Sequence, residues 1–181
     1  RYQPSTKCLQ MVSNIVTLYQ QASQTKSIYD QWIDTFTKAM PDLVFDIPIA
    51  LKKITRVIEK CCLKYMTLED YNKPCDAKKV GDIVRGMITC NSMQEETYAV
   101  QRIFDSKEVV VLRVKDRFVQ EPSAGGWRDC MINFNFKDDP NQHICELQLI
   151  HNQMMTARKG LPGHAVYNRV RNASELLMLI D

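Results

Sequence analysis

The sequence lacks several features that would assign it to a special class. No stretch approaches the ~20 consecutive apolar residues of a membrane-spanning helix, and the start of the chain shows no signal peptide. The seven cysteines include no CxxC pair, which argues against a simple zinc or redox motif. The net charge of +3 is mild, and nucleic-acid binding needs a clustered basic patch instead. There is also no internal repeat and no low-complexity segment.

The composition that remains is ordinary for a globular protein. Of 181 residues, 45% are hydrophobic and 25% are charged, which fits one domain, or a domain with a helical extension, that buries a core without disulfides. The odd cysteine count and the adjacent Cys61 and Cys62 indicate reduced thiols, so we expect a cytoplasmic protein. Because the chain begins at Arg1 and not at Met, we expect a fragment of a larger protein.

The first third of the chain predicts helices. No Gly or Pro occurs between Pro4 and Pro41, and apolar residues recur at helical spacing, so residues 5–39 are predicted as helix. The polar residues 23–26 are expected to join two antiparallel helices. A second helix, predicted at 49–65, presents Lys and Arg side chains opposite its apolar stripe, and they are Lys52, Lys53, Arg56 and Lys60.

Beyond residue 80 the apolar pattern changes to the period of strands. The expected strands are 82–90, 108–118, 126–136 and 143–151, with a helix at 92–106, a turn at 138–142 and helix from 152 onward. This order predicts an α+β (mixed α/β) domain with a mixed sheet of four or five strands flanked by helices. We expect an N-terminal helical hairpin or extension over residues 1–47 and the main domain over 48–181.

Each of the last three predicted strands has an apolar and a polar face, because side chains alternate along a strand. On the first of them, Val110, Leu112 and Val114 are expected on the apolar face. The polar faces are expected to carry Arg113, Lys115, Arg117, Trp127, Asp129, Met131, Asn133, Glu146 and Gln148. The neighbouring cations of the first strand repel one another unless an anion lies beside them. The carboxylates of the other two strands are of the kind that binds divalent ions. The pattern favours a metal-assisted reaction on phosphate; a solvated sheet face is the alternative.

Six short motifs follow one another along the chain in a set order. They are the basic helix "LKKITRVIEK", the strand "GDIVRGMITC", the Lys–Asp pair of "RVKDRF", the loop "PSAGGWRDCMIN", the glutamate strand "CELQL" and "GLPGHAVY". In this order, residues 48 to 171 resemble the synthetase domain of RelA/SpoT proteins, which make the alarmones ppGpp and pppGpp. That domain belongs to the nucleotidyltransferase-like superfamily.

The resemblance implies an activity and a set of site residues. The activity is transfer of pyrophosphate from ATP, the donor, to the 3′-hydroxyl of GDP or GTP with Mg²⁺. Asp82 and Glu146 are implied as metal ligands and catalytic residues, with Glu146 as general base. Asp129 is expected to join the metal or to pair with Arg128. The implied nucleotide-binding residues are Lys52, Arg56, Arg85 and Lys115 for phosphates, Trp127 for stacking on the acceptor base, and His164.

The chain also departs from the pattern of well-studied synthetases. Ala50, Met87 and Ile150 stand where arginines are usual, and Asp129 and Met131 stand where a serine and a histidine are usual. These departures indicate a divergent branch and leave two alternatives beside a (p)ppGpp-synthetase-like enzyme. One is a catalytically degenerate domain that binds a nucleotide or a protein within a larger chain. The other is an enzyme that transfers pyrophosphate onto RNA.

Overall fold

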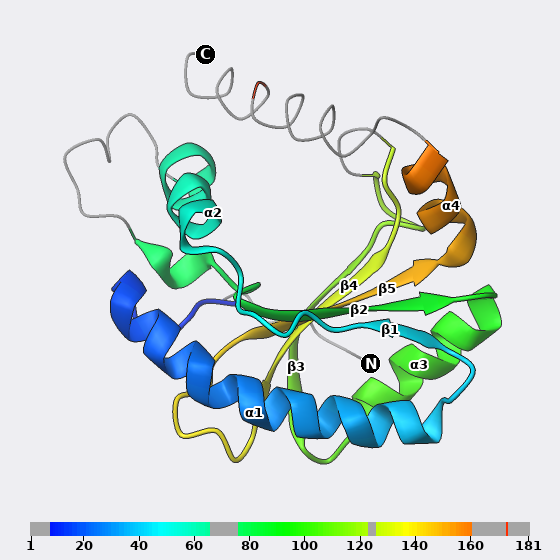
Figure 1. Cartoon of the computed structure of the whole chain (residues 1–181), viewed down its shortest axis with the longest axis horizontal. Coiled ribbons are helices and arrows are strands. Elements are labelled where there is room, and N and C mark those ends of the chain that lie inside the picture. The colour runs from blue at the N-terminus through cyan, green and yellow to red at the C-terminus, as the bar shows by residue number, and fades with distance from the viewer. Residues whose placement is uncertain (1–7, 66–75, 123–125, 161–172, 174–181) are drawn as a thin grey trace.

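The computed structural model describes residues 8–65, 76–122, 126–160 and 173. Five strands form one mixed sheet in the order β1-β2-β5-β4-β3 (Figure 1). The strands are β1 (Val44–Asp46), β2 (Val84–Cys90), β3 (Val109–Asp116), β4 (Cys130–Phe136) and β5 (Cys145–His151). The helices are α1 (Ile15–Ala39), α2 (Ile54–Glu59), the π-helix η1 (Lys60–Tyr65), the 3-10 helix η3 (Ala77–Lys79), α3 (Met93–Asp105) and α4 (Asn152–Gly160).

The sheet topology confirms the expected fold class. β2 and β5 are parallel, and the other neighbouring strands are antiparallel, including the predicted β4–β5 hairpin. Helices α1 and α3 lie on one side of the sheet, and α2 and α4 lie on the other (Figure 1). In the described part of the chain, no helix is both long and apolar enough to cross a membrane.

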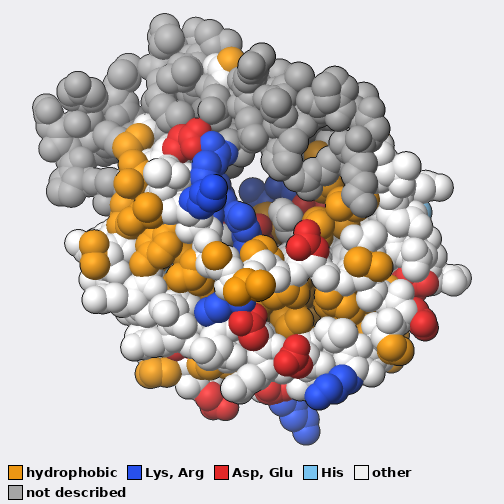
Figure 2. Space-filling model, viewed as in Figure 1, with side chains coloured by type: hydrophobic (Ala, Val, Ile, Leu, Met, Phe, Trp, Pro, Cys, Tyr) orange, Lys and Arg blue, Asp and Glu red, His pale blue; other side chains and the backbone are white. Residues whose placement is uncertain are grey.

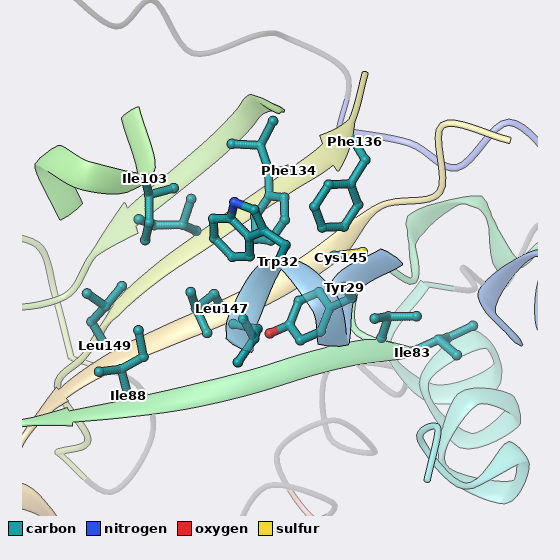
Figure 3. Close-up of a cluster of buried hydrophobic side chains, with 14 of the residues drawn as sticks. Tyr29, Trp32, Ile83, Ile88, Ile103, Phe134, Phe136, Cys145, Leu147 and Leu149 are labelled. Carbon is teal, nitrogen blue, oxygen red and sulfur yellow. The ribbon is translucent and has the colours of Figure 1, made fainter. Parts of the chain in front are cut away.

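The core lies between α1 and the sheet. Tyr29 and Trp32 of α1 pack on Phe134 of β4, with ring centroids 6.1 and 5.2 Å away (Figure 3). Burial of such aromatic side chains is a main source of folding free energy. Gly86 of β2 permits this close approach, because a Cβ atom there would lie 2.6 Å from the Tyr29 hydroxyl. That hydroxyl donates to the backbone carbonyl of Glu146, 3.3 Å away.

The expected helical hairpin near the N-terminus is wrong. Helix α1 runs without a break through residues 23–26 and begins only at Ile15, where the Asn14 side chain accepts a hydrogen bond from the backbone N–H of Thr17. The polar stretch does not break the helix because Thr25 is buried and donates to Asp139, 2.7 Å away, in the β4–β5 turn.

The segment between α1 and α2 also differs from the prediction. It contributes β1, an edge strand antiparallel to β2 that the sequence pattern did not indicate. Helix α2 begins at Ile54 and not at residue 49. The residues just before it do not join the helix, because both backbone groups of Lys52 bond elsewhere: its N–H donates to the Ile83 carbonyl and its carbonyl accepts from the Tyr19 hydroxyl.

Strand β3 contains an irregularity that changes its faces. The register with β4 shifts between Val111 and Arg113, as it does at a β-bulge. Val109 is consequently buried and Val110 is exposed, so the expected placement of Val110 on the apolar face was wrong. After the shift, Arg113 and Lys115 lie opposite Asn133 and Met131 of β4, on the polar face as predicted.

Candidate functional site

The polar face of the sheet carries two rows of side chains that the strand register brings side by side. The first row is Arg85, Glu146, Asn133 and Arg113, and the second is Met87, Gln148, Met131 and Lys115. Beside this face, Lys and Arg side chains gather over α2 and reach inward toward the sheet (Figure 2). The register therefore places the predicted Glu146 between cations from β2 and β3.

Asp82 lies just before β2, where three cations surround it. Its side chain is buried, and Oδ2 accepts hydrogen bonds from Lys52 and from Lys60, the latter at 2.7 Å. Arg85 Nη1 lies 3.9 Å from the same oxygen. Lys60 was not among the predicted site residues. Its position eight residues after Lys52 in the basic stretch is the sequence signal that it joins the same group.

These contacts set the charge states around Asp82. Burial by itself would raise the pKa of Asp82, but Lys60 and Lys52 hold that pKa well below its usual range. Burial lowers the pKa of Lys52 to about 8, although Asp82 opposes the shift. Because burial of an unpaired charge is costly, the carboxylate and the two ammonium groups stabilise one another. The cluster is a preformed group of charges next to the sheet.

Glu146 on β5 is the second buried carboxyl group of the face. Burial raises its pKa to about 7, the charge of Asp82 adds to this, and Lys60 and Lys52 oppose it. A carboxyl group with a pKa near neutrality accepts and releases a proton at physiological pH, which is what a general base requires. Glu146 and Asp82 are thus two carboxyl groups whose surroundings shift their pKa values in opposite directions.

The two carboxyl groups also match what a Mg²⁺ ion requires of a protein. Mg²⁺ is usually held by one or two carboxylates together with substrate phosphates. Asp82 Oδ1 is buried and, within the described residues, has no hydrogen-bond partner, so this oxygen is available as a ligand. Among the same residues, no group of three or more His, Cys, Asp or Glu side chains is arranged to hold a metal ion.

The other predicted nucleotide-binding residues that the structure describes lie outside the cluster around Asp82. Arg56 on α2 pairs with Glu59, and Lys115 is exposed on β3. Trp127 is half-buried just before β4. His164 lies outside the described residues, so its expected role keeps the status of a prediction.

Asp129 pairs with Arg117 and not with Arg128. It is fully buried and forms an ion pair with Arg117, whereas Arg128 donates to the backbone carbonyls of Arg117 and Phe118. The expected pairing of Asp129 with Arg128 was therefore wrong. The reason is that Arg117 follows β3 directly alongside the start of β4, where its backbone N–H also bonds to the Asp129 carbonyl.

Apolar side chains replace two groups that the resemblance implies. Met87 and Met131 lie on either side of Gln148 in the second row, and both are buried. An arginine and a histidine are usual at these two positions. This part of the face is consequently less charged than the row that contains Glu146.

Comparison with solved structures identifies the fold. Small alarmone synthetase 2 from Bacillus subtilis superposes with a TM-score of 0.59 at 14% identity, over 86% of this chain and 80% of that chain. Small alarmone synthetase 1 from Bacillus subtilis, bound to its product pppGpp, gives 0.57 at 16% identity, over 87% and 83%. A GTP pyrophosphokinase family protein from Streptococcus pneumoniae gives 0.56 at 11% identity, over 88% and 84%.

Comparison of the sequence gave no match, in contrast to comparison of the structure. No protein-family model matches the sequence, and no curated protein matches it. At 11–16% identity the structural likeness establishes the fold, and a fold by itself does not establish a reaction. The chain has the fold of the small alarmone synthetases, as the resemblance predicted.

Proposed function

We propose that this chain is a Mg²⁺-dependent transferase that moves pyrophosphate from ATP to the 3′-hydroxyl of a nucleotide. The observation that carries the proposal is the pair of buried carboxyl groups, Asp82 and Glu146, set among Lys52, Lys60 and Arg85. The fold neighbours support it, since they are alarmone synthetases and a GTP pyrophosphokinase family protein. A guanosine nucleotide is the first acceptor to test, because one neighbour is bound to its product pppGpp.

In this proposal the lysines around Asp82 bind the ATP phosphates. Lys52 and Lys60 are held next to the sheet by Asp82, so their positive charge is in place before ATP binds. Preorganised positive charge of this kind stabilises the charge that develops on transferring phosphate groups. Arg85 extends the same patch along β2, and Lys115 extends it along β3.

Glu146 acts on the acceptor in this scheme. It takes the proton of the 3′-hydroxyl, whose oxygen forms a bond to the β-phosphorus of ATP. The bond from that phosphorus to the oxygen bridging to the α-phosphate breaks, and AMP leaves. Trp127 stacks on the acceptor base. Asp82 and Glu146 would hold the Mg²⁺ ion, which supplies charge neutralisation on the phosphate oxygens.

A product screen tests the proposal directly. The purified protein is incubated with ATP and Mg²⁺ and, in turn, with GDP, GTP, AMP, ADP or bulk tRNA, and the products are separated by anion exchange. AMP that forms only with one acceptor establishes the reaction and identifies the acceptor. Product on tRNA alone would replace the nucleotide acceptor by RNA.

The matched control is Glu146→Gln, which keeps the shape of the side chain and removes the base. We expect turnover to fall about 10²- to 10⁴-fold. The melting temperature should stay at or above that of the wild type, because the variant no longer buries an ionisable group. Equal activity in this variant would rule out the assigned role of Glu146.

A second function is favoured by Met87 and Met131. Because buried methionines occupy positions where charged groups are usual, a domain that binds a nucleotide without catalysis is the alternative. Isothermal titration with ATP and GTP separates the two functions. Binding without product in any acceptor reaction would support the binding domain.

A further inference from the structure

One buried side-chain amide joins the two chain segments that carry the site's carboxyl groups. Asn133 of β4 is fully buried, and its Nδ2 donates to the Gly81 carbonyl at 3.1 Å and to the Cys145 carbonyl at 3.4 Å. Gly81 immediately precedes Asp82, and Cys145 immediately precedes Glu146. The amide therefore ties together the peptide units from which both carboxyl-bearing residues extend.

The orientation of this amide is set from the opposite side. Arg113 of β3 donates to Asn133 Oδ1 through Nε at 3.0 Å and Nη2 at 2.8 Å. Since guanidinium only donates, it holds the oxygen of the amide toward β3 and the nitrogen toward β2 and β5. The chain of contacts from Arg113 through Asn133 thus crosses the sheet and ends at both carboxyl-bearing segments.

The space around Gly81 is shaped for this contact. A Cβ atom at Gly81 would lie 3.3 Å from Asn133 Nδ2 and 3.2 Å from a methyl group of Ile144. Both contacts are tighter than usual, so the amide and the methyl group would have to shift by a few tenths of an ångström. Asp82 needs such a contact, because it lies before β2 begins and no strand pairing holds it.

A second amide nearby provides a natural comparison. Gln10 is also buried, and its side chain bonds to the Val80 carbonyl, the Ile144 carbonyl and the Ile144 N–H at 2.9, 3.3 and 3.0 Å. It therefore joins the same two segments one residue earlier. Gln10 has no hydrogen bond to the peptide units next to Asp82 and Glu146, so it serves as a structural control.

We propose that Asn133, oriented by Arg113, is a positioning residue that sets the spacing of Asp82 and Glu146 for the transfer reaction. The inference rests on the proposed function, because it names the transfer reaction. The spacing of Asp82 and Glu146, however, can be tested on the protein without any substrate. Asn133 also lies directly opposite Glu146 in the sheet register. Loss of the amide therefore removes the bonds that fix the peptide units next to Asp82 and Glu146.

The test compares Asn133→Leu with Gln10→Leu in the full chain. The backbone ¹H–¹⁵N resonances of Asp82 and Glu146 belong to the two peptide units that Asn133 bonds, and they are compared with those of the wild type at one pH without substrate. We expect both resonances to shift in Asn133→Leu, because these hydrogen bonds are lost. They should shift less in Gln10→Leu, whose bonds lie one peptide unit earlier. If Asn133→Leu does not fold, Gly81→Ala is measured in its place, and only the Glu146 resonance is compared.

Kinetics add a second readout. For the acceptor found in the screen, we expect kcat of Asn133→Leu to fall about 10- to 100-fold, as for outer groups that orient ligands, with KM for ATP nearly unchanged. Identical behaviour of the two Leu variants, in the Asp82 and Glu146 resonances and in kcat, would overturn the inference. If the wild type makes no product but the two resonances shift clearly more in Asn133→Leu than in Gln10→Leu, the positioning role stands and the proposed reaction fails.

Discussion

On the α1 side of the sheet, the buried side chains include aromatic rings that pack on one another, whereas those on the α2 side include two carboxyl groups. Tyr29, Trp32 and Phe134 represent the first kind, and Asp82 and Glu146 the second. Removing apolar surface from water stabilises the fold, while removing charges from water costs free energy unless they are paired. The aromatic face therefore contributes the folding free energy that offsets the cost of burying carboxyl groups on the other face.

Buried carboxyl groups also occur in two different settings. Asp82 lies between two lysines, and its pKa is lowered. Glu96 on α3 is equally buried, but burial, Asp116 and Asp129 together raise its pKa to about 7. Within the described residues, Glu96 Oε2 has no hydrogen-bond partner. The pKa of a buried carboxyl group is therefore shifted down or up, depending on whether cations or carboxylates lie nearby.

The largest expected effect comes from the apolar face. Phe134→Ala should lower the free energy of unfolding by about 3–5 kcal/mol, because it removes a fully buried ring from the aromatic cluster. Gln148→Ala, on the polar face of the neighbouring strand, should lower it by less than about 1 kcal/mol. Urea unfolding of both variants checks this. Equal losses would contradict the division of roles between the two faces.

The second prediction concerns the pH dependence of Glu96. Its folded-state pKa of about 7 exceeds the ordinary value of 4.5, so its stabilising contribution is complete below pH 4.5 and is lost as pH rises through 7. At 1.36 kcal/mol per pH unit this amounts to about 3 kcal/mol. Glu96→Gln should therefore be more stable than the wild type at pH 8, and the gain should shrink toward pH 5 in thermal unfolding.

Asp82→Asn is the matched contrast to that variant. The pKa of Asp82 is lowered, so its contribution is present above its ordinary pKa of 3.8 and is lost as the pH falls below that value. Asp82→Asn should consequently be less stable than the wild type at pH 8. A gain in stability at pH 8 in both variants would remove the distinction between the two carboxyl groups.

The smallest expected effect distinguishes two cations on the charged face. Lys60→Met should weaken MgATP binding about 10-fold, as expected for loss of one hydrogen bond to a charged group. Arg56→Met should weaken it less, because Glu59 already pairs with that guanidinium. Isothermal titration calorimetry measures both. A larger loss of MgATP affinity in Arg56→Met than in Lys60→Met would identify Arg56, and not Lys60, as the main phosphate ligand of this segment.

Local patterns in the sequence were enough for most elements and for the faces of β4 and β5. Ile132, Phe134 and Leu147 alternate with polar residues and are buried as predicted. Such periodicity depends only on neighbours along the chain, so it is visible without a structure. The resemblance singled out Asp82 and Glu146, and both side chains are buried. Strand β1 was not predicted, because a segment of three residues is too short to show the alternation of apolar and polar side chains.

Contacts between distant residues were decided by the tertiary structure alone. The placement of Lys60 on Asp82, of Arg117 on Asp129 and of Asn133 between two carbonyl groups depends on how separate segments pack. The irregularity in β3 that turned Val110 outward is likewise a property of its pairing with β4. The sequence by itself determined which residues are apolar, charged or helical. Only packing decided which charges meet, because ion pairs and buried hydrogen bonds form between groups that the chain brings together from far apart.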